Sequence, residues 1–149
     1  MYDTVSAKRN TEMVAKAIGE VLKEKGFDVD CLYVKDVDVA GVKNYDCVVA
    51  GGPTQWLKAT GLIMQFLEGF AKNEFSGKFA AAFDTQLQVP LSGNAAKGIE
   101  KKLRKLGFRM VMPPLVTYVE GKMNEIQLKE GELDKTRKYA EDLAKALHQ

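Results

Sequence analysis

Short apolar runs alternate along this chain with segments in which apolar residues recur at helical spacing. The helical spacing predicts four helices, over residues 10–25, 62–70, 95–106 and 133–147. The apolar runs predict the strands Phe27–Val34, Tyr45–Ala50, Lys78–Phe83, Phe108–Met112 and Leu115–Val119. Alternating strands and helices form βαβ units, in which the strands lie parallel and the helices cover the sheet. We therefore expect an α/β fold with a doubly wound, mostly parallel sheet and helices on both faces.

The length and composition suit one soluble domain that spans residues 1–149. Hydrophobic residues make up 46% of the chain and charged residues 28%, which is typical of a globular protein. No apolar run approaches the roughly 18 residues of a membrane span. The first turns carry Lys8, Arg9 and Glu12 where a signal peptide would be apolar. We therefore expect a cytoplasmic protein with no membrane contact.

Charge, histidine and cysteine content exclude several classes of function. A net charge of +2, evenly spread, argues against binding of nucleic acid. The one histidine, His148, lies next to the last residue, which removes histidine-based triads and most zinc sites. Cys31 and Cys47 lie in apolar runs without a CxxC partner, so buried free thiols are favoured over metal or redox motifs. We expect no metal site.

Ligands of parallel α/β sheets bind at the carboxyl ends of the strands, so the loops after Tyr2, Ala50 and Phe83 are the candidate site. The first loop, DTVSAKRNT, offers hydroxyl and amide groups and leads into a helix N-terminus. Free N–H groups and the helix dipole make such a terminus a candidate phosphate site. An ordinary N-cap by Asn10 or Thr11 is the alternative for this loop taken alone.

The second and third loops offer groups suited to a planar heterocycle. Trp56, the only tryptophan, follows Gly-Gly-Pro-Thr, where its ring can stack on a planar ligand, although a lone tryptophan is usually a packing residue. Asp84, Thr85, Gln86 and Gln88 can hydrogen-bond the edge of such a ring. Ser92-Gly93-Asn94 are expected to cap the following helix.

Three motifs in this order resemble those of the flavodoxin family over essentially the whole chain. Asn10-Thr11-Glu12 match the end of the family's phosphate loop, T/S-x-T-G-N-T-E. Gly51 to Trp56 resemble its second loop, G-x-P-T-aromatic, with the aromatic residue delayed one place by Gln55. The stretch AFDT at Ala82–Thr85, followed by LSGNAAKGIEKKLRKLGF, is similar to one prokaryotic branch.

The resemblance implies that the protein binds FMN, with the phosphate in the first loop and the isoalloxazine ring between the second and third. The cofactor-binding residues that it implies are Thr4, Ser6, Lys8, Arg9, Asn10, Thr11, Pro53, Thr54, Gln55, Trp56, Leu57, Asp84, Thr85, Gln86 and Leu87.

The chain also departs from the family pattern. Arg9 stands where the family has a glycine before Asn10, and Lys8 adds a second cation. These cations either pair with the phosphate dianion or point to water. The third loop lacks the tyrosine that often covers the outer flavin face and offers only Leu87 and Val89.

The function implied by the resemblance is a low-potential electron carrier, without catalytic residues, that shuttles single electrons between redox partner proteins. The alternative is an FMN-dependent NAD(P)H:quinone-type oxidoreductase. The missing tyrosine leaves room for its second substrate, but no long insertion builds a pocket for it. A phospho-receiver domain needs an aspartate where this chain has Ala50-Gly51-Gly52, and one histidine cannot supply the usual ligands of a diiron centre.

The first strand is largely missing. In the family it is central, between the strands that here begin at Phe27 and Tyr45, and this chain keeps only Met1 and Tyr2 of it. Such a gap would leave unpaired strand edges. We expect Phe27–Val34 to close onto Tyr45–Ala50, another segment to fill the gap, or a second subunit to cover it. A homodimer is the favoured solution, and a start site assigned too late is the alternative.

Overall fold

The computed structural model describes residues 1, 10–55, 58–59, 61–90, 93–122 and 125–149. Its helices are α1 (Asn10–Glu24), α2 (Gly61–Glu68), α3 (Ala95–Lys105) and α4 (Glu132–Leu147). Its strands are β1 (Cys47–Gln55), β2 (Lys58–Ala59), β3 (Phe79–Leu87), β4 (Arg109–Met110), β5 (Leu115–Glu120) and β6 (Gln127–Leu128). Two short 3-10 helices, η1 (Val34–Asp36) and η2 (Ala40–Asn44), precede β1.

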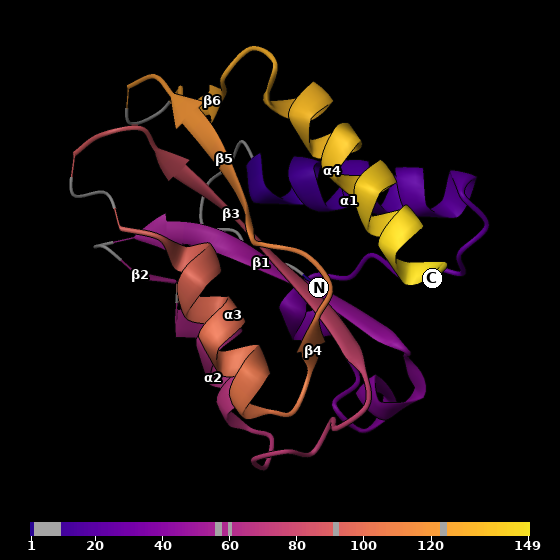
Figure 1. Cartoon of the computed structure of the whole chain (residues 1–149). Coiled ribbons are helices and arrows are strands. Elements are labelled where there is room, and N and C mark those ends of the chain that lie inside the picture. The colour runs from indigo at the N-terminus through magenta and orange to yellow at the C-terminus, as the bar shows by residue number, and fades with distance from the viewer. Residues whose placement is uncertain (2–9, 56–57, 60, 91–92, 123–124) are drawn as a thin grey trace.

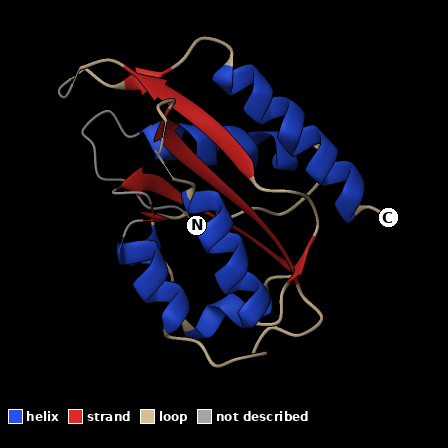
Figure 2. Ribbon diagram, turned by 60° about the vertical axis from the view of Figure 1, so that its left-hand side comes forward, coloured by secondary structure: helices blue, strands red, loops and turns tan. Residues whose placement is uncertain are grey.

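These strands form one mixed sheet in the order β2-β1-β3-β5-β6, with β4 also paired to β3 (Figure 1). The pairs that β3 makes with β1, β4 and β5 are parallel, whereas β2 and β6 add antiparallel strands at the edges. Helices α2 and α3 lie on one face, and α1 and α4 on the other (Figure 2). The predicted α/β class, with a mostly parallel sheet and helices on both faces, is confirmed.

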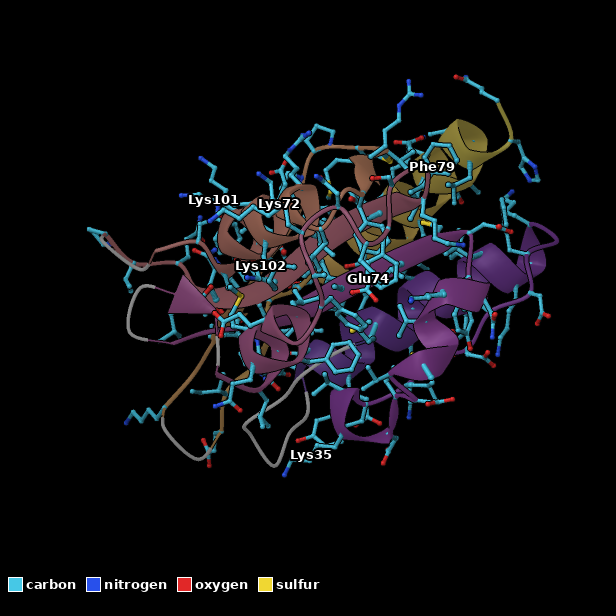
Figure 3. All side chains as sticks on the ribbon, turned by 90° about the horizontal axis from the view of Figure 1, so that it is seen from below. Lys35, Lys72, Glu74, Phe79, Lys101 and Lys102 are labelled. Carbon is cyan, nitrogen blue, oxygen red and sulfur yellow. The ribbon has the colours of Figure 1, made fainter. Side chains whose placement is uncertain are left out.

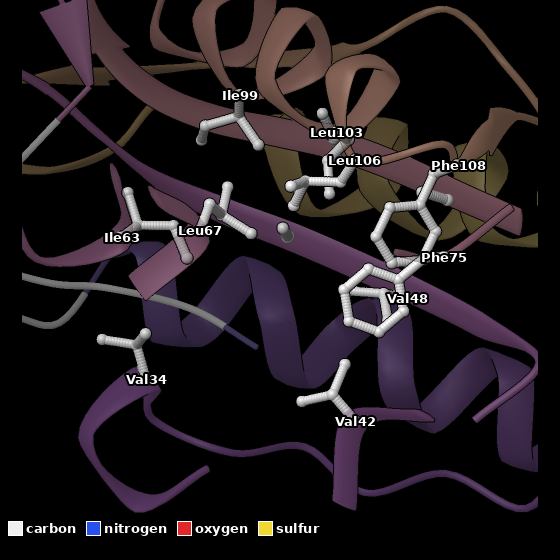
Figure 4. Packing of buried hydrophobic residues seen from close by; sticks show 13 residues of the cluster. Val34, Val42, Val48, Ile63, Leu67, Phe75, Ile99, Leu103, Leu106 and Phe108 are labelled. Atoms are coloured by element: carbon white, nitrogen blue, oxygen red, sulfur yellow. The ribbon is translucent and has the colours of Figure 1, made fainter. Parts of the chain in front are cut away.

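The sheet separates two hydrophobic cores, because successive strand residues point to opposite faces. In β3, Ala80 and Ala82 belong to the first core, and Ala81 and Phe83 to the second. The first core lies under α2 and α3 (Figure 4) and includes the stacked rings of Phe75 and Phe108, with centroids 4.7 Å apart. The second core joins the sheet to the paired helices α1 and α4.

The strand predicted over Phe27–Val34 is wrong. Residues 27–32 form no strand, Tyr33 makes a single bridge, and Val34 begins η1. The alternating pattern identified the buried side chains correctly, since Phe27, Val29 and Cys31 pack against the second core. A strand also needs a neighbouring backbone with which to form a ladder. Among the described residues, none forms such a ladder with 27–32.

Strands β1 and β3 run further than predicted. The predicted ends were Ala50 and Phe83, but the parallel ladder continues through the pair Pro53 and Thr85, and β3 reaches Leu87 beside Val119 of β5. Much of the second and third predicted loops therefore consists of strand ends. At the end of β1, Thr54 and Gln55 also pair with the short antiparallel strand β2.

Met1 is the described remnant of the expected first strand. Its amino group donates a hydrogen bond of 2.7 Å to the Val49 carbonyl, and the Gly51 N–H donates to the Met1 carbonyl at 3.2 Å. This is the pattern of a parallel neighbour placed opposite Ala50. Residues 27–32 do not close onto β1, and a cavity separates the two segments.

Candidate functional site

The candidate site lies at the carboxyl ends of the parallel strands, where the arrowheads of β1, β3 and β5 point in Figure 1. Hydrogen bonds tie the N-termini of α1 and α3 to the same strand ends. The first turn of each of these helices lies at this edge of the sheet. The ends of three strands and the N-termini of two helices are thereby brought to one place.

Asp84 is the centre of a hydrogen-bond network at the end of β3. Its Oδ2 accepts from the Thr54 hydroxyl at 3.1 Å, the Gln86 amide at 2.9 Å and the Ala96 backbone N–H at 3.2 Å. The Thr54 hydroxyl in turn accepts from the Ala95 N–H at 2.9 Å. Thr54 and Asp84 thus bind the first N–H groups of α3, which satisfies donors that a helix leaves unpaired.

The other carboxylate oxygen of Asp84 has no protein partner. Asp84 is fully buried, and its Oδ1 is the buried side-chain polar atom without a hydrogen bond among the described residues. Burial raises the pKa of Asp84 above its ordinary 3.8, while the hydrogen bonds to Oδ2 act in the opposite direction. A buried acceptor at the ligand edge of the sheet is suited to an N–H group of a bound molecule.

The start of α1 is fixed by two side chains that face the protein. The hydroxyls of Thr11 and Thr85 share a hydrogen bond of 2.7 Å, and the Asn10 amide donates to the Ile126 carbonyl at 3.1 Å. Both Asn10 and Thr11 are buried. They hold the helix terminus against β3 and the segment before β6, and the side-chain groups of these two residues are engaged in protein contacts.

The end of β3 is apolar and open to solvent. Leu87 and Val89 are 43% and 53% exposed. Between them, the Gln88 side chain accepts a hydrogen bond from Lys129 at 2.8 Å, which ties this strand end to the segment after β6. The outer side of the site therefore presents two aliphatic side chains.

The structure brings together six of the residues predicted from sequence: Asn10, Thr11, Thr54, Asp84, Thr85 and Gln86. Pro53 lies beside Thr85 in the ladder, and Leu87 ends β3. Gln55 ends β1. Outside the described residues lie Thr4, Ser6, Lys8, Arg9, Trp56 and Leu57, which stay predictions.

Sequence reasoning missed Thr117 and the role of the α3 terminus. The buried Thr117 hydroxyl donates to the Asp84 carbonyl at 2.6 Å, and the available signal was a threonine inside the mostly apolar run of β5. The expected cap of α3 is confirmed at Asn94, whose side chain accepts from the Lys97 N–H. The network of Asp84 with Thr54 had no sequence signal, because it depends on how two strands end side by side.

Other kinds of site are not formed by the part of the chain that the structure describes. It contains no group of three or more histidine, cysteine or acidic residues placed to hold a metal ion. Within the same ranges, no helix combines the length and apolar character needed to cross a bilayer. Cys31 and Cys47 are free, and burial raises the pKa of Cys47 to about 12.

A family model described as flavodoxin matches residues 4–139. An archaeal flavodoxin structure is similar at a TM-score of 0.79 and 24% identity, covering 99% of this chain and 97% of that one. The structure of oxidised flavodoxin 2 from Bacillus cereus is similar at a TM-score of 0.80 and 20% identity, covering 97% of this chain and 96% of that one. The rubredoxin oxygen:oxidoreductase of Desulfovibrio gigas is similar at a TM-score of 0.76 and 21% identity, covering 99% of this chain and 35% of that one. No curated protein sequence matches the chain.

Proposed function

Since the chain belongs to the flavodoxin family of FMN-binding electron-transfer proteins, we propose that it shuttles single electrons at low potential between redox partner proteins. The observation that carries this proposal is the convergence of the α1 terminus and the ends of β1 and β3 on one site. FMN supplies the electron-accepting ring, and the protein sets its environment. No residue of this network is assigned a catalytic role.

For the phosphate of FMN, we assign the binding groups to the first turn of α1 and the loop before it. The helix terminus supplies N–H donors and a positive dipole end. Asn10 and Thr11, held by Ile126 and Thr85, keep that terminus in place. Thr4, Ser6, Lys8 and Arg9 would add hydroxyl donors and positive charge.

For the ring, we assign the ends of β1 and β3. The unpartnered Asp84 Oδ1 is an acceptor that fits an N–H group on the edge of a heterocycle, while a hydroxyl and an amide group bond the other oxygen, Oδ2. Pro53, Gln55, Leu57, Gln86 and Leu87 complete the proposed contacts. Trp56 is proposed to stack on the ring, so its fluorescence should be quenched with FMN bound and recover on removal. Equal emission in the two forms would contradict stacking.

The cofactor assignment is tested on the purified protein. We expect a flavin absorbance spectrum and, after acid release, the mass of FMN. Recovery of FAD would contradict the proposal. Single-electron transfer is tested by mixing the reduced protein with a one-electron acceptor such as a cytochrome c and following both spectra.

A second candidate function is an FMN-dependent NAD(P)H:quinone-type oxidoreductase. The exposed Leu87 and Val89 favour it, because they leave room above the ring for a second planar molecule. Anaerobic mixing with NADH or NADPH separates the two functions. Rapid bleaching of the flavin would support the oxidoreductase, whereas an electron carrier should react slowly.

We also propose that the protein is a cytoplasmic homodimer. Association would cover the apolar side chains exposed at the end of β3, Leu87 and Val89. Light scattering at micromolar concentration should give the mass of two chains, and the mass of one chain would contradict the dimer. Fractionation of the source cells would test the location.

A further inference from the structure

The outer side of α3 carries a cluster of lysines. The 11 residues of this helix include five cations and one glutamate, whereas the net charge of the whole chain is only +2. Lys97, Lys101 and Lys105 follow one another at intervals of four residues, which places them on one side of the helix. Positive charge is therefore in clear excess on this part of the surface.

The loop before β3 adds a lysine to the same region. The Asn73 N–H donates to the Lys105 carbonyl at 3.1 Å, which places Lys72 next to the end of α3. Figure 3 shows Lys72, Lys101 and Lys102 in one region of the molecule. We call five residues the basic face, of which Lys102 is half-buried and the others are exposed: Lys72, Lys97, Lys101, Lys102 and Lys105.

The protein does not neutralise the basic face. Among the described residues, none of the five lysines forms an ion pair, and the glutamate of α3, Glu100, pairs with Arg104 at 2.8 Å. Like charges four residues apart on a helix, such as Lys97 and Lys101, repel one another. The helix dipole favours cations in the last turn, but Lys97 lies in the first turn, at the positive end. Helix stability therefore does not explain this arrangement, whereas an anionic partner would offset the repulsion.

The chemistry of the basic face favours a protein partner over a membrane or a nucleic acid. The apolar residues Ile99 and Leu103 of α3 are fully buried, so the helix has no apolar face to insert into a bilayer. The helix also contains no aromatic residue on which a base could stack. Lysines are strongly hydrated and are depleted in the cores of stable interfaces. They suit a short-lived encounter with carboxylates.

The basic face begins at the candidate site. The Ala95 N–H donates to the Thr54 hydroxyl and the Ala96 N–H to Asp84, and Lys97 follows directly. From there the helix extends for about 16 Å. A protein bound along α3 would therefore also lie beside the ends of β1 and β3.

We propose that the basic face docks an acidic redox partner protein, which presents a row of aspartate and glutamate side chains beside its own redox centre. This inference rests on the proposed function of electron carrier and assigns the charge of the partner. The lysines attract the carboxylates at long range, which speeds the encounter, and they orient the partner at the candidate site.

The test compares two forms of one electron acceptor: native cytochrome c, which is basic, and cytochrome c with succinylated lysines, which is acidic. The reduced, FMN-loaded protein passes one electron to the ferric haem of either form. With the acidic form, the second-order rate constant should fall as salt rises from about 0.01 M to about 0.15 M, because the Debye length falls from about 30 Å to about 8 Å. A rate constant that stays level or rises would overturn the proposal.

Two variants locate the docking surface. Lys97→Glu with Lys101→Glu, called the face variant, should react about tenfold more slowly with the acidic form at low salt, while its FMN spectrum stays unchanged. Lys23→Glu with Lys145→Glu is the matched control, because it changes the net charge equally at exposed positions of α1 and α4, across the sheet. Equal rate constants for the two variants would place docking elsewhere and overturn the proposal.

Binding is also measured without electron transfer, which separates this proposal from the proposed function. With both proteins oxidised, acidic cytochrome c should shift the amide NMR signals of residues 95–105 in the parent protein but not in the face variant. If native cytochrome c is reduced and these signals do not shift, the docking surface alone is overturned. If the signals shift and neither form is reduced, the electron carrier is overturned and docking of an acidic protein is supported.

The same variants test the other occupants of the basic face. Binding at about 0.15 M salt to vesicles of phosphatidylcholine and phosphatidylserine in equal parts, or to a duplex DNA, would overturn the proposal if the face variant alone lost it. A dimer that dissociated only in the face variant would assign the surface to a second copy of this chain and would also overturn it. We expect neither loss.

Discussion

At the scale of single residues, Asp84 determines the geometry of the candidate site at a cost in electrostatic free energy. One oxygen holds three donors from two strands and a helix, and the other has none. The carboxyl therefore organises the strand ends but is poorly suited to carrying a buried charge. Burial raises the pKa of Asp84, although the hydrogen bonds that it accepts act in the opposite direction.

Asp84→Asn should change the pH dependence of stability. Because the folded pKa of Asp84 is raised above 3.8, the folded chain binds this proton more tightly than the unfolded chain does. The contribution to the free energy of unfolding is therefore full below pH 3.8 and is lost as pH rises through the folded pKa. The asparagine side chain does not titrate, so the variant does not lose this free energy as pH rises. Its free energy of unfolding relative to that of the parent should therefore increase from pH 4 to pH 8 in urea titrations.

The control for this comparison is Asp134→Asn, because the side chain of Asp134 is 89% exposed. Its curve of stability against pH should run parallel to that of the parent protein. If the curve of Asp84→Asn also ran parallel to that of the parent, burial would not govern the pKa of the Asp84 carboxyl.

The hydrogen bond between Thr11 and Thr85 couples the start of α1 to β3. Thr11→Val or Thr85→Val leaves the other hydroxyl buried and unpaired, which should cost about 1–3 kcal/mol of unfolding free energy. The double variant should lose less than the sum of the two, by about 1 kcal/mol. Strict additivity in urea titrations would contradict a direct bond, and Ser76→Ala, at an exposed hydroxyl, should change little.

Residue types in the candidate site were predictable, but their contacts were not. A run such as Asp84-Thr85-Gln86 at the end of an apolar strand predicts a ligand edge, which stays a prediction, and Asn94 before a helical pattern predicts a cap, which is confirmed. That Asp84 turns toward Thr54 and α3 depends on the paired ends of β1 and β3, which no local pattern encodes.

At the scale of elements, the contact between β1 and β3 depends on a glycine opposite an aromatic ring. Gly51 and Phe83 are direct neighbours in the ladder, so their side-chain positions share one face. A Cβ on Gly51 would lie against the Phe83 ring at a distance that real structures do not show. The glycine lets this ring lie on the backbone of β1 and fill the second core.

Gly51→Ala should therefore destabilise the protein by about 3 kcal/mol, because the ring and the strand must move apart. Gly98→Ala is the matched control, since its added methyl meets nothing within 4 Å and lies inside α3. It should stabilise the protein by about 0.5–1 kcal/mol through helix propensity. Chemical unfolding of both variants measures the difference, and equal effects would contradict the close contact.

The elements that were predicted correctly are those in which the sequence pattern and the contacts in the folded protein favour the same secondary structure. The four helices carry their own apolar face and stop signals, and the run at Lys78 contains Ala80–Phe83, which are buried on both faces of the sheet. Phe27–Val34 failed because burial alone does not make a strand, and its ladder partner is not formed by the described residues. The strand ends at Gln55 and Leu87 were missed because partner strands extend them through polar residues.

At the scale of the whole molecule, FMN and the fold stabilise one another. A ligand that binds only the folded state adds about 2.7 kcal/mol at a concentration of 100 times its Kd. For a domain of this size, the melting temperature should rise by roughly 5–10 °C. Riboflavin lacks the phosphate and should give a smaller rise at equal concentration. An equal rise with both in thermal melts would contradict the phosphate site at α1.

The pairing of α1 with α4 has a consequence for synthesis on the ribosome. The second core contains residues of both helices, yet the described strands β1 to β6 are translated between them. While α4 is still inside the exit tunnel, Val14, Phe83 and Leu115 lack part of their cover, so this face of the nascent chain is a target for chaperones. Ribosome-arrested chains that end before Glu132 should be cut rapidly by protease, and chains arrested with α4 fully outside the tunnel should resist. Equal resistance of the two would show that the sheet and α1 fold without the last helix.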